Sequence, residues 1–165
     1  MNHAQLFAFE SDFVASLRCI PMAVRFKLDH CLVKLSLRQW SRLTQADREQ
    51  LLLTPCVTAE EAAAYRAILL ELIALRADGQ MKMLEEAPEP LWEQSATTPE
   101  AIRAFARSIS IQPLSDLDWK GLTLLQRFVL LKLSRDNHDN VNFVPALQEF
   151  GLPVNGAQRS LSASA

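Results

Sequence analysis

The sequence predicts an all-α protein, a compact single-domain bundle of helices around one central apolar helix. The central helix is predicted over about 121–135, GLTLLQRFVLLKLSR, because leucine, phenylalanine and valine leave it little polar face. A helix that is apolar nearly all round belongs in a protein interior. Helix-start signals also recur along the chain, as serine or threonine followed three positions later by a side chain that completes a capping box. No segment predicts a β-strand.

Length and composition agree with one folded domain. A chain of 165 residues can bury a real core without disulfides or metals. It is 49% hydrophobic with only four glycines, which favours a globule over disorder. We assign residues 1–6 to a loose lead-in, 7–152 to the single helical domain, and 153–165 to a disordered tail.

The first half of the chain is predicted to be helical from its caps and apolar spacing. Ser11 or Asp12 can cap a short helix that carries Phe13 and ends before Ile20-Pro21. Pro21 suits the first turn of the next helix, at about 21–33.

Further helix starts in this half are marked by pairs with capping-box spacing: Ser36 with Gln39, Thr44 with Asp47, and Thr58 with Glu61. The last pair opens the longest predicted helix, about 59–78, with Gly79 as its stop.

The second half starts with a long connection over 80–97, which contains prolines and acidic residues. Pro99 then opens a helix, and Ser115 caps a brief turn before the central helix. Pro145 opens a short last helix that ends at Gly151.

Charge and hydropathy exclude several classes of protein. The net charge is −2, from 17 basic and 19 acidic residues, and there is no basic run of the kind that nucleic-acid-binding proteins carry. Arg127 and Lys132 interrupt the apolar run, which is too short to span a membrane. The first 13 residues lack the charged and apolar regions of a signal peptide. We therefore expect a cytoplasmic protein that binds neither nucleic acid nor membrane.

Searches for catalytic motifs favour a protein that is not an enzyme. The four glycines are scattered and form no phosphate-binding loop. His3, His30 and His138 are far apart and lack the spacing of metal ligands. We expect no metal, no cofactor and no catalytic residue.

The three cysteines, Cys19, Cys31 and Cys56, are widely spaced and include no C-x-x-C pair. We expect Cys31 and Cys56 to behave as small buried hydrophobic residues. Cys19 lies beside Arg18, which could favour a thiolate if both are exposed, although nothing local supplies a general base.

Residues 7–40 contain LRCIPM followed by VRFKLD, and this segment resembles the N-terminal signature of the conserved nitrate reductase-associated protein family. Residues 122–152 resemble that family's C-terminal block. The resemblance covers most of 7–152. It implies a glycine after Cys31, where this chain has Leu32, and a Pro-Gly pair in place of Asp136-Asn137.

The resemblance implies an accessory role. Members of the family are small proteins encoded beside assimilatory nitrate reductases, which are molybdenum enzymes, and the resemblance implies that they are non-catalytic factors needed for an active reductase. Two other hypotheses stay open from the residues alone. One is a helical regulatory module with a different partner, and the other is a thiol-dependent enzyme or carrier that uses Cys19.

The contact with the reductase is expected on the charged N-terminal signature, because arginine is favoured at interfaces. The candidate contact residues are Phe7, Phe9, Phe13, Arg18, Cys19, Arg25, Lys27 and Asp29. The non-functional interpretation is a helix ion pair between Arg25 and Asp29, worth only ~0.2–0.5 kcal/mol. The connection over 80–97 is the next candidate surface.

Overall fold

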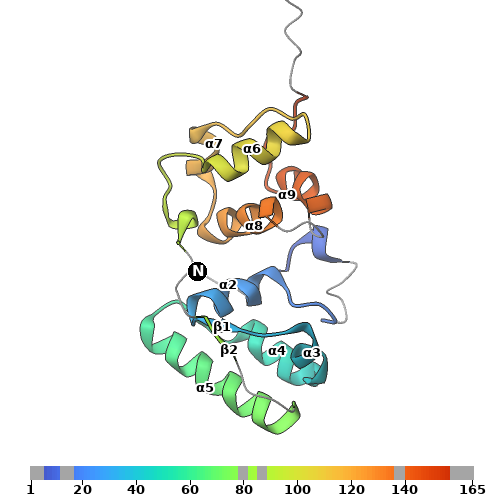
Figure 1. The fold of residues 1–165 in the computed structure, drawn as a ribbon, viewed down its shortest axis with the longest axis vertical. Coiled ribbons are helices and arrows are strands. Elements are labelled where there is room, and N and C mark those ends of the chain that lie inside the picture. The colour runs from blue at the N-terminus through green and yellow to red at the C-terminus, as the bar shows by residue number, and fades with distance from the viewer. Residues whose placement is uncertain (1–5, 12–16, 78–81, 85–88, 136–139, 157–165) are drawn as a thin grey trace, which may run out of the picture. The chain divides into compact units, whose positions relative to one another are not determined.

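The computed structural model describes residues 6–11, 17–77, 82–84, 89–135 and 140–156, and these residues are predominantly helical, as predicted (Figure 1). The chain divides into two compact units, Met1–Pro90 and Leu91–Ala165, each with its own internal contacts. We refer to them as unit 1 and unit 2. We predicted one domain over 7–152, which would require the two units to fold together. This stays a prediction.

Unit 1 is built around helix α2. Its helices are η1 (Ala8–Glu10), α2 (Met22–His30), α3 (Leu37–Arg42), α4 (Gln45–Leu53) and α5 (Ala59–Arg76). Helix α2 packs against α4, and α4 packs against α5. Trp40 and Tyr65 are among the largest fully buried side chains of this unit. The short helix predicted to carry Phe13 falls on residues 12–16, which lie outside the described residues.

A small sheet in unit 1 contradicts the prediction that the chain has no strand. Strand β1 (Val33–Lys34) pairs antiparallel with β2 (Lys82–Met83), and Val33 lies opposite Met83. The Leu84 amide extends the pairing by donating to the Leu32 carbonyl at 3.0 Å. Strands of two residues are too short to show an alternating pattern, and β2 lies within the predicted connection over 80–97.

The capping boxes predicted in unit 1 are confirmed. The hydroxyl of each cap accepts a hydrogen bond from the backbone N–H three residues on, and the side chain at that position accepts one from the cap's own N–H, for Ser36 with Gln39, Thr44 with Asp47, and Thr58 with Glu61. The longest helix ends at Arg76, two residues before the predicted 78. The predicted stop at Gly79 lies outside the described residues.

The carboxylate of Asp47, which caps α4, also pairs with Arg76 at the end of α5. Asp47 is only 8% exposed, and its Oδ2 accepts from the Thr44 N–H at 2.9 Å and from Arg76 Nε at 3.0 Å. Burial raises the pKa of Asp47, but the hydrogen bonds from Thr44 and the charge of Arg76 outweigh it and leave that pKa below its ordinary value. The ionised carboxylate therefore stabilises the fold.

The Asp47→Asn variant should lose roughly 1–2 kcal/mol of unfolding free energy at pH 7, because hydrogen bonds to a charged group are lost. A carboxyl whose pKa is lowered on folding contributes fully above its unfolded pKa of about 3.9, and its contribution disappears as pH falls through the lower folded value. The difference between wild type and variant should therefore shrink between pH 5 and pH 3 in urea titrations. Glu71→Gln, at an exposed position of α5, is the control. A difference that stays constant with pH would contradict this assignment.

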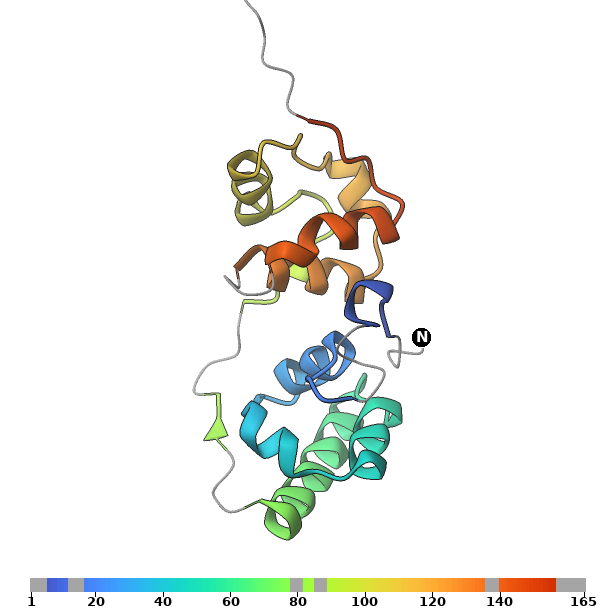
Figure 2. The ribbon, with the colours of Figure 1, turned by 90° about the vertical axis from the view of Figure 1, so that its right-hand side faces the viewer.

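Unit 2 is organised around α8 (Leu124–Arg135), as the sequence predicts. The 3-10 helices η2 (Leu91–Glu93) and η3 (Asn140–Asn142) and the helices α6 (Glu100–Ser108) and α9 (Phe143–Glu149) all pack against it. In both views α9 lies beside α8 (Figures 1 and 2). Six of the 12 residues of α8 are buried.

The central helix starts at Leu124 and not at 121, because Gly121 is the last residue of α7 (Asp116–Gly121). Thr123 and Gln126 exchange reciprocal hydrogen bonds, of 2.9 and 3.2 Å, at the new start. Helix α9 begins at Phe143, so Pro145 occupies its first turn instead of opening it. The Ser115 cap of α7 is confirmed.

The first part of the predicted disordered tail packs on unit 2. The Gln112 N–H donates to the Asn155 carbonyl at 2.8 Å, and Ile111 forms an antiparallel bridge with Gly156. Residues 153–156 therefore lie along the segment that follows α6. Residues 157–165 lie outside the described residues, and for them disorder stays a prediction.

Candidate functional site

The most specific part of the sequence pattern, LRCIPM, contains a loop over Leu17–Pro21 that we call the signature loop. Leu17 is buried and adopts a positive φ of 49°. Its carbonyl accepts hydrogen bonds from Trp40 Nε1 at 2.8 Å and from Arg48 Nη1 at 3.3 Å. The Ile20 carbonyl accepts from Arg25 Nε at 3.2 Å. Both ends of the loop are thus held by side-chain donors.

Arg48 links the signature loop to α3. Besides its bond to Leu17, it donates to the Trp40 carbonyl at 3.3 Å and to the Ser41 carbonyl at 3.1 Å. Its guanidinium lies 5.8 Å from the centre of the Trp40 ring, within the range of a cation–π contact. Arg48 therefore has a structural role that fixes the loop's shape.

The Glu10 side chain caps the N-terminus of helix α2, although Glu10 lies 12 residues before Met22 in the chain. The helix is preceded by Pro21, which forms no side-chain cap of its own. The buried Glu10 carboxylate accepts from the Met22 N–H at 2.6 Å and from the Phe7 N–H at 3.3 Å. A negative charge at a helix N-terminus is stabilised by the helix dipole. Sequence reasoning missed this role, although an α2 start without a Ser, Thr, Asp or Asn cap was a signal that a cap must come from elsewhere.

Lys27 is fully buried on the inner side of α2, at 2% exposure. Its Nζ donates to the Leu52 carbonyl at 2.6 Å and to the Thr54 carbonyl at 2.7 Å, and it lies 5.8 Å from the Tyr65 ring centre. These carbonyls lie at the C-terminal end of α4, where a cation is favoured. Burial lowers the pKa of Lys27. The lysine therefore ties three helices together.

Two buried thiols lie next to this lysine, and we call Cys31 and Cys56 the thiol pair. Their predicted burial is confirmed. The Cys56 thiol donates to the Lys27 carbonyl at 3.7 Å, and the Cys31 thiol donates to the Leu28 carbonyl at 3.6 Å. Both thiols therefore donate to neighbouring backbone carbonyls of α2. The thiol pair and Lys27 thus form one buried polar cluster in unit 1.

The two thiols differ in acidity. The neighbouring Cys56 thiol lowers the pKa of Cys31; burial opposes this change, and the charge of Arg66 supports it. The neighbouring Cys31 thiol, together with burial, raises the pKa of Cys56. Arg66 is held in place by two bonds to the Cys31 carbonyl, of 3.0 and 2.7 Å.

Leu32 follows Cys31 with a φ of 59°. This is the left-handed region, where glycine is the default residue just after a helix. The resemblance implied a glycine at this position, and the structure gives the physical reason. Leu32 adopts the same conformation with a steric cost of about 1–2 kcal/mol.

The predicted contact residues do not form one exposed patch. Lys27 and Phe7 are buried, so their side chains cannot be surface contacts, which corrects their place among the candidates. Phe13 lies outside the described residues. Arg18 is exposed, and the remaining candidates are half-buried: Phe9, Cys19, Arg25 and Asp29. A partner role for these five stays a prediction.

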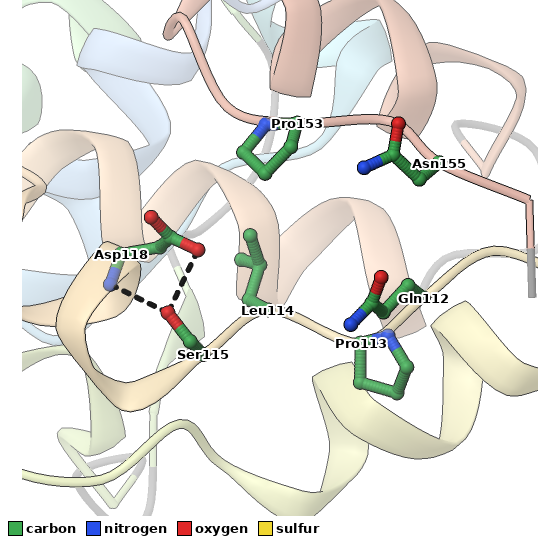
Figure 3. A pocket seen from close by; sticks show the side chains of 7 residues that line it. All are labelled: Gln112, Pro113, Leu114, Ser115, Asp118, Pro153 and Asn155. Atoms are coloured by element: carbon green, nitrogen blue, oxygen red, sulfur yellow. Dashed lines mark hydrogen bonds between the residues drawn. The ribbon is translucent and has the colours of Figure 1, made fainter.

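A pocket in unit 2 is small, and two of its polar residues are already bonded to each other. It has a volume of about 240 Å³ and lies between residues 112–118 and the start of the tail (Figure 3). The Ser115 hydroxyl donates to the Asp118 carboxylate at 2.8 Å and accepts from the Asp118 N–H at 3.1 Å, so these two groups serve the cap of α7. Ligand pockets usually measure about 300–1,000 Å³.

The described residues contain no group of three His, Cys, Asp or Glu side chains placed to hold a metal ion. None of the described helices combines the length and the hydropathy needed to cross a membrane. The polar clusters found in unit 1 are instead hydrogen-bonded to the backbone.

Comparison with known proteins gives one result. A family model described as conserved nitrate reductase-associated protein matches residues 6–150, a range that includes the signature loop and extends to the end of α9. Searches of curated proteins found no match. Searches of solved structures found none either.

Proposed function

Because the chain belongs to the conserved nitrate reductase-associated protein family, we propose that it is an accessory factor for an assimilatory, molybdenum-containing nitrate reductase. It acts in the cytoplasm as a non-catalytic maturation or assembly factor, through protein–protein contact. The observation that carries the proposal is the family match over residues 6–150.

The use of polar residues in unit 1 supports a non-catalytic role. Glu10, Lys27 and Arg48 are charged side chains near the signature loop and α2, and each is bonded to backbone groups. A catalytic acid or base must instead reach a substrate proton. These residues build the fold that presents the surface, and the surface carries the function.

The exposed part of the signature loop is the best candidate contact. Arg18 is exposed and follows Leu17, whose carbonyl is fixed by two donors. An arginine on a rigid backbone loses less conformational entropy on binding than one on a loose segment. Its guanidinium would pair with a carboxylate on the reductase.

The direct experiment uses a strain that lacks the gene for this protein and carries the reductase. We expect slow growth on nitrate and little reductase activity, both restored by the full chain, with normal growth on ammonium. A tagged chain should capture the reductase from the same cells. Unchanged reductase activity in the deletion strain would refute the proposal. Molybdenum analysis of the purified reductase separates a role in cofactor loading from a role in stabilising the enzyme.

Two alternatives make different predictions in that experiment. A regulatory module with another target would capture a different protein and leave the reductase unaffected. A thiol-dependent carrier would depend on Cys19, which is half-buried in the signature loop. Folded Cys19→Ser that fails to restore nitrate growth would favour the carrier, and normal growth would exclude it.

A further inference from the structure

We propose that Asn155, which is followed by Gly156, is a modification site at which the asparagine loses ammonia and becomes aspartate or isoaspartate without an enzyme. The reactants are the Asn155 side-chain amide, the backbone nitrogen of Gly156 and water. The pair lies in the segment 153–156, which packs along residues 111–112 in unit 2. This modification goes beyond the proposed function and does not depend on it.

Both reacting groups are accessible and unbonded. The Asn155 side chain is exposed, and Figure 3 shows its amide beside the pocket of unit 2. Among the described residues, no hydrogen bond uses this amide or the Gly156 N–H. Ile111 and Gly156 form the kind of antiparallel pair that shares no hydrogen bond, because the neighbouring bond runs from the Gln112 N–H to the Asn155 carbonyl. The attacking nitrogen is therefore available.

The residue after the asparagine favours the reaction at this position. A β-carbon on that residue crowds the attacking nitrogen, and glycine has none. The sequence contains a single Asn-Gly pair, at Asn155. Asn140 and Asn142 are followed instead by Val141 and Phe143, which carry large side chains. These two asparagines are therefore slower sites within the same chain.

The reaction requires a local opening of the segment. Extended backbone keeps the Gly156 nitrogen away from the Asn155 side chain, so the pair has to leave the bridge before a ring can form. Among the described residues, one backbone hydrogen bond, of 2.8 Å, joins the segment 153–156 to Gln112. A segment with so few backbone bonds opens at a low free energy, without unfolding of the helices.

The reaction balances with water as the added reactant. The Gly156 nitrogen attacks the side-chain carbonyl carbon of Asn155, a C–N bond forms, and ammonia leaves with the proton from the Gly156 nitrogen. The product is a five-membered succinimide ring. Water then breaks one of the two C–N bonds of the ring: opening at the side-chain carbonyl gives aspartate, and opening at the backbone carbonyl gives isoaspartate. In total, one water enters and one ammonia leaves.

Isoaspartate releases the segment 153–156 from its neighbour. The chain then runs through the former side chain, which adds one carbon to the backbone. The carbonyl that accepted the bond from Gln112 becomes a free carboxylate, and the partner of Ile111 moves out of register. The new negative charge also lies at the pocket that Asp118 lines, where like charges repel. The modification therefore opens this edge of unit 2.

The test incubates the folded, full-length chain at mildly alkaline pH, cleaves it after glutamate and maps the peptides by mass. Cleavage after Glu149 separates Asn155 from the two slower sites. We expect the Asn155 peptide to become heavier by one mass unit, because oxygen replaces NH, and to split into aspartate and isoaspartate forms. The peptide with Asn140 and Asn142 should keep its mass. Hydrogen exchange at the Gln112 amide should become faster in the isoaspartate form.

Two variants test the mechanism. An added β-carbon at Gly156 meets no atom within 4 Å, so Gly156→Ala should fold normally. Its conversion should be roughly tenfold slower, which corresponds to about 1.4 kcal/mol in the barrier. Asn155→Asp adds the carboxylate but keeps the register, so exchange at Gln112 should change less than in the isoaspartate form.

The folded wild type decides the question even if a variant fails to fold. An unchanged mass at Asn155 would overturn the proposal, as would equal conversion at Asn140 and Asn142. Conversion of folded Gly156→Ala at the wild-type rate would exclude attack by the backbone nitrogen. Equal exchange at Gln112 in the unmodified and isoaspartate forms would contradict the release of the segment.

Discussion

Replacing Phe128 with alanine should lower the unfolding free energy by roughly 3–5 kcal/mol, because the removed ring leaves a cavity in a packed interior. Phe128 lies in α8 and has no exposed surface. Its ring meets Trp92 edge-on with centroids 5.3 Å apart, and Lys132 Nζ lies 5.4 Å from its centre. A domain whose whole stability is about 5–15 kcal/mol would lose a large share of it.

Urea unfolding followed by circular dichroism measures this loss. The matched control is Leu117→Ala in α7, where the leucine is 79% exposed and the change should cost less than about 0.5 kcal/mol. Trp92 and Trp119 report on unit 2 by fluorescence, and Trp40 reports on unit 1. A cost for Phe128→Ala below about 1 kcal/mol would mean that α8 is not the packed centre of unit 2.

Local signals predicted the helices well. Each cap of the type at Ser36, Thr44, Thr58 and Ser115 depends on a partner three residues away. Such a pair is visible in the sequence because the spacing is fixed by the first helical turn. The apolar α8 was equally visible, since a helix without a polar face has to be buried. Its start was missed because Gly121 completes a separate short helix.

Contacts between distant residues were not predictable in this way. The bond from the Met22 N–H to Glu10 spans 12 residues, and Lys27 reaches the Thr54 carbonyl across 27. Charged residues are rarely fully buried, so Lys27 was expected on the surface. Only the fold shows that the end of α4 supplies the carbonyls that make its burial acceptable. The thiol pair was hidden for the same reason, because its cysteines are 25 positions apart (56 minus 31).

The candidate contact is defined by the sequence pattern and the structure together. The pattern indicated charged residues around the signature loop, and the structure sorts them by environment. Arg25 uses its Nε to hold the Ile20 carbonyl, so changing it would disturb the loop as well as any interface. Arg18 is exposed, and no hydrogen bond or ion pair involves its side chain among the described residues. Arg18 is therefore the residue whose change tests contact without changing the fold.

Arg18→Glu should abolish the ability of the chain to restore nitrate growth, while its melting temperature stays within a degree or two of wild type. Removing a hot-spot arginine from an interface costs about 2 kcal/mol or more in binding. A reversed charge adds repulsion from the carboxylate with which the arginine paired. Capture of the reductase should therefore fall by roughly thirtyfold or more, since 1.4 kcal/mol corresponds to a factor of ten.

The matched control for this change is Arg42→Glu, which makes the same charge reversal at an exposed position of α3, outside the 7–40 signature segment. General electrostatic attraction would make both variants equally weak, and high salt would then also weaken capture by the wild-type chain. A specific contact makes only Arg18→Glu fail. If folded Arg18→Glu still restores reductase activity, the contact lies elsewhere, and the described part of the 80–97 connection, which includes η2, becomes the surface to change next.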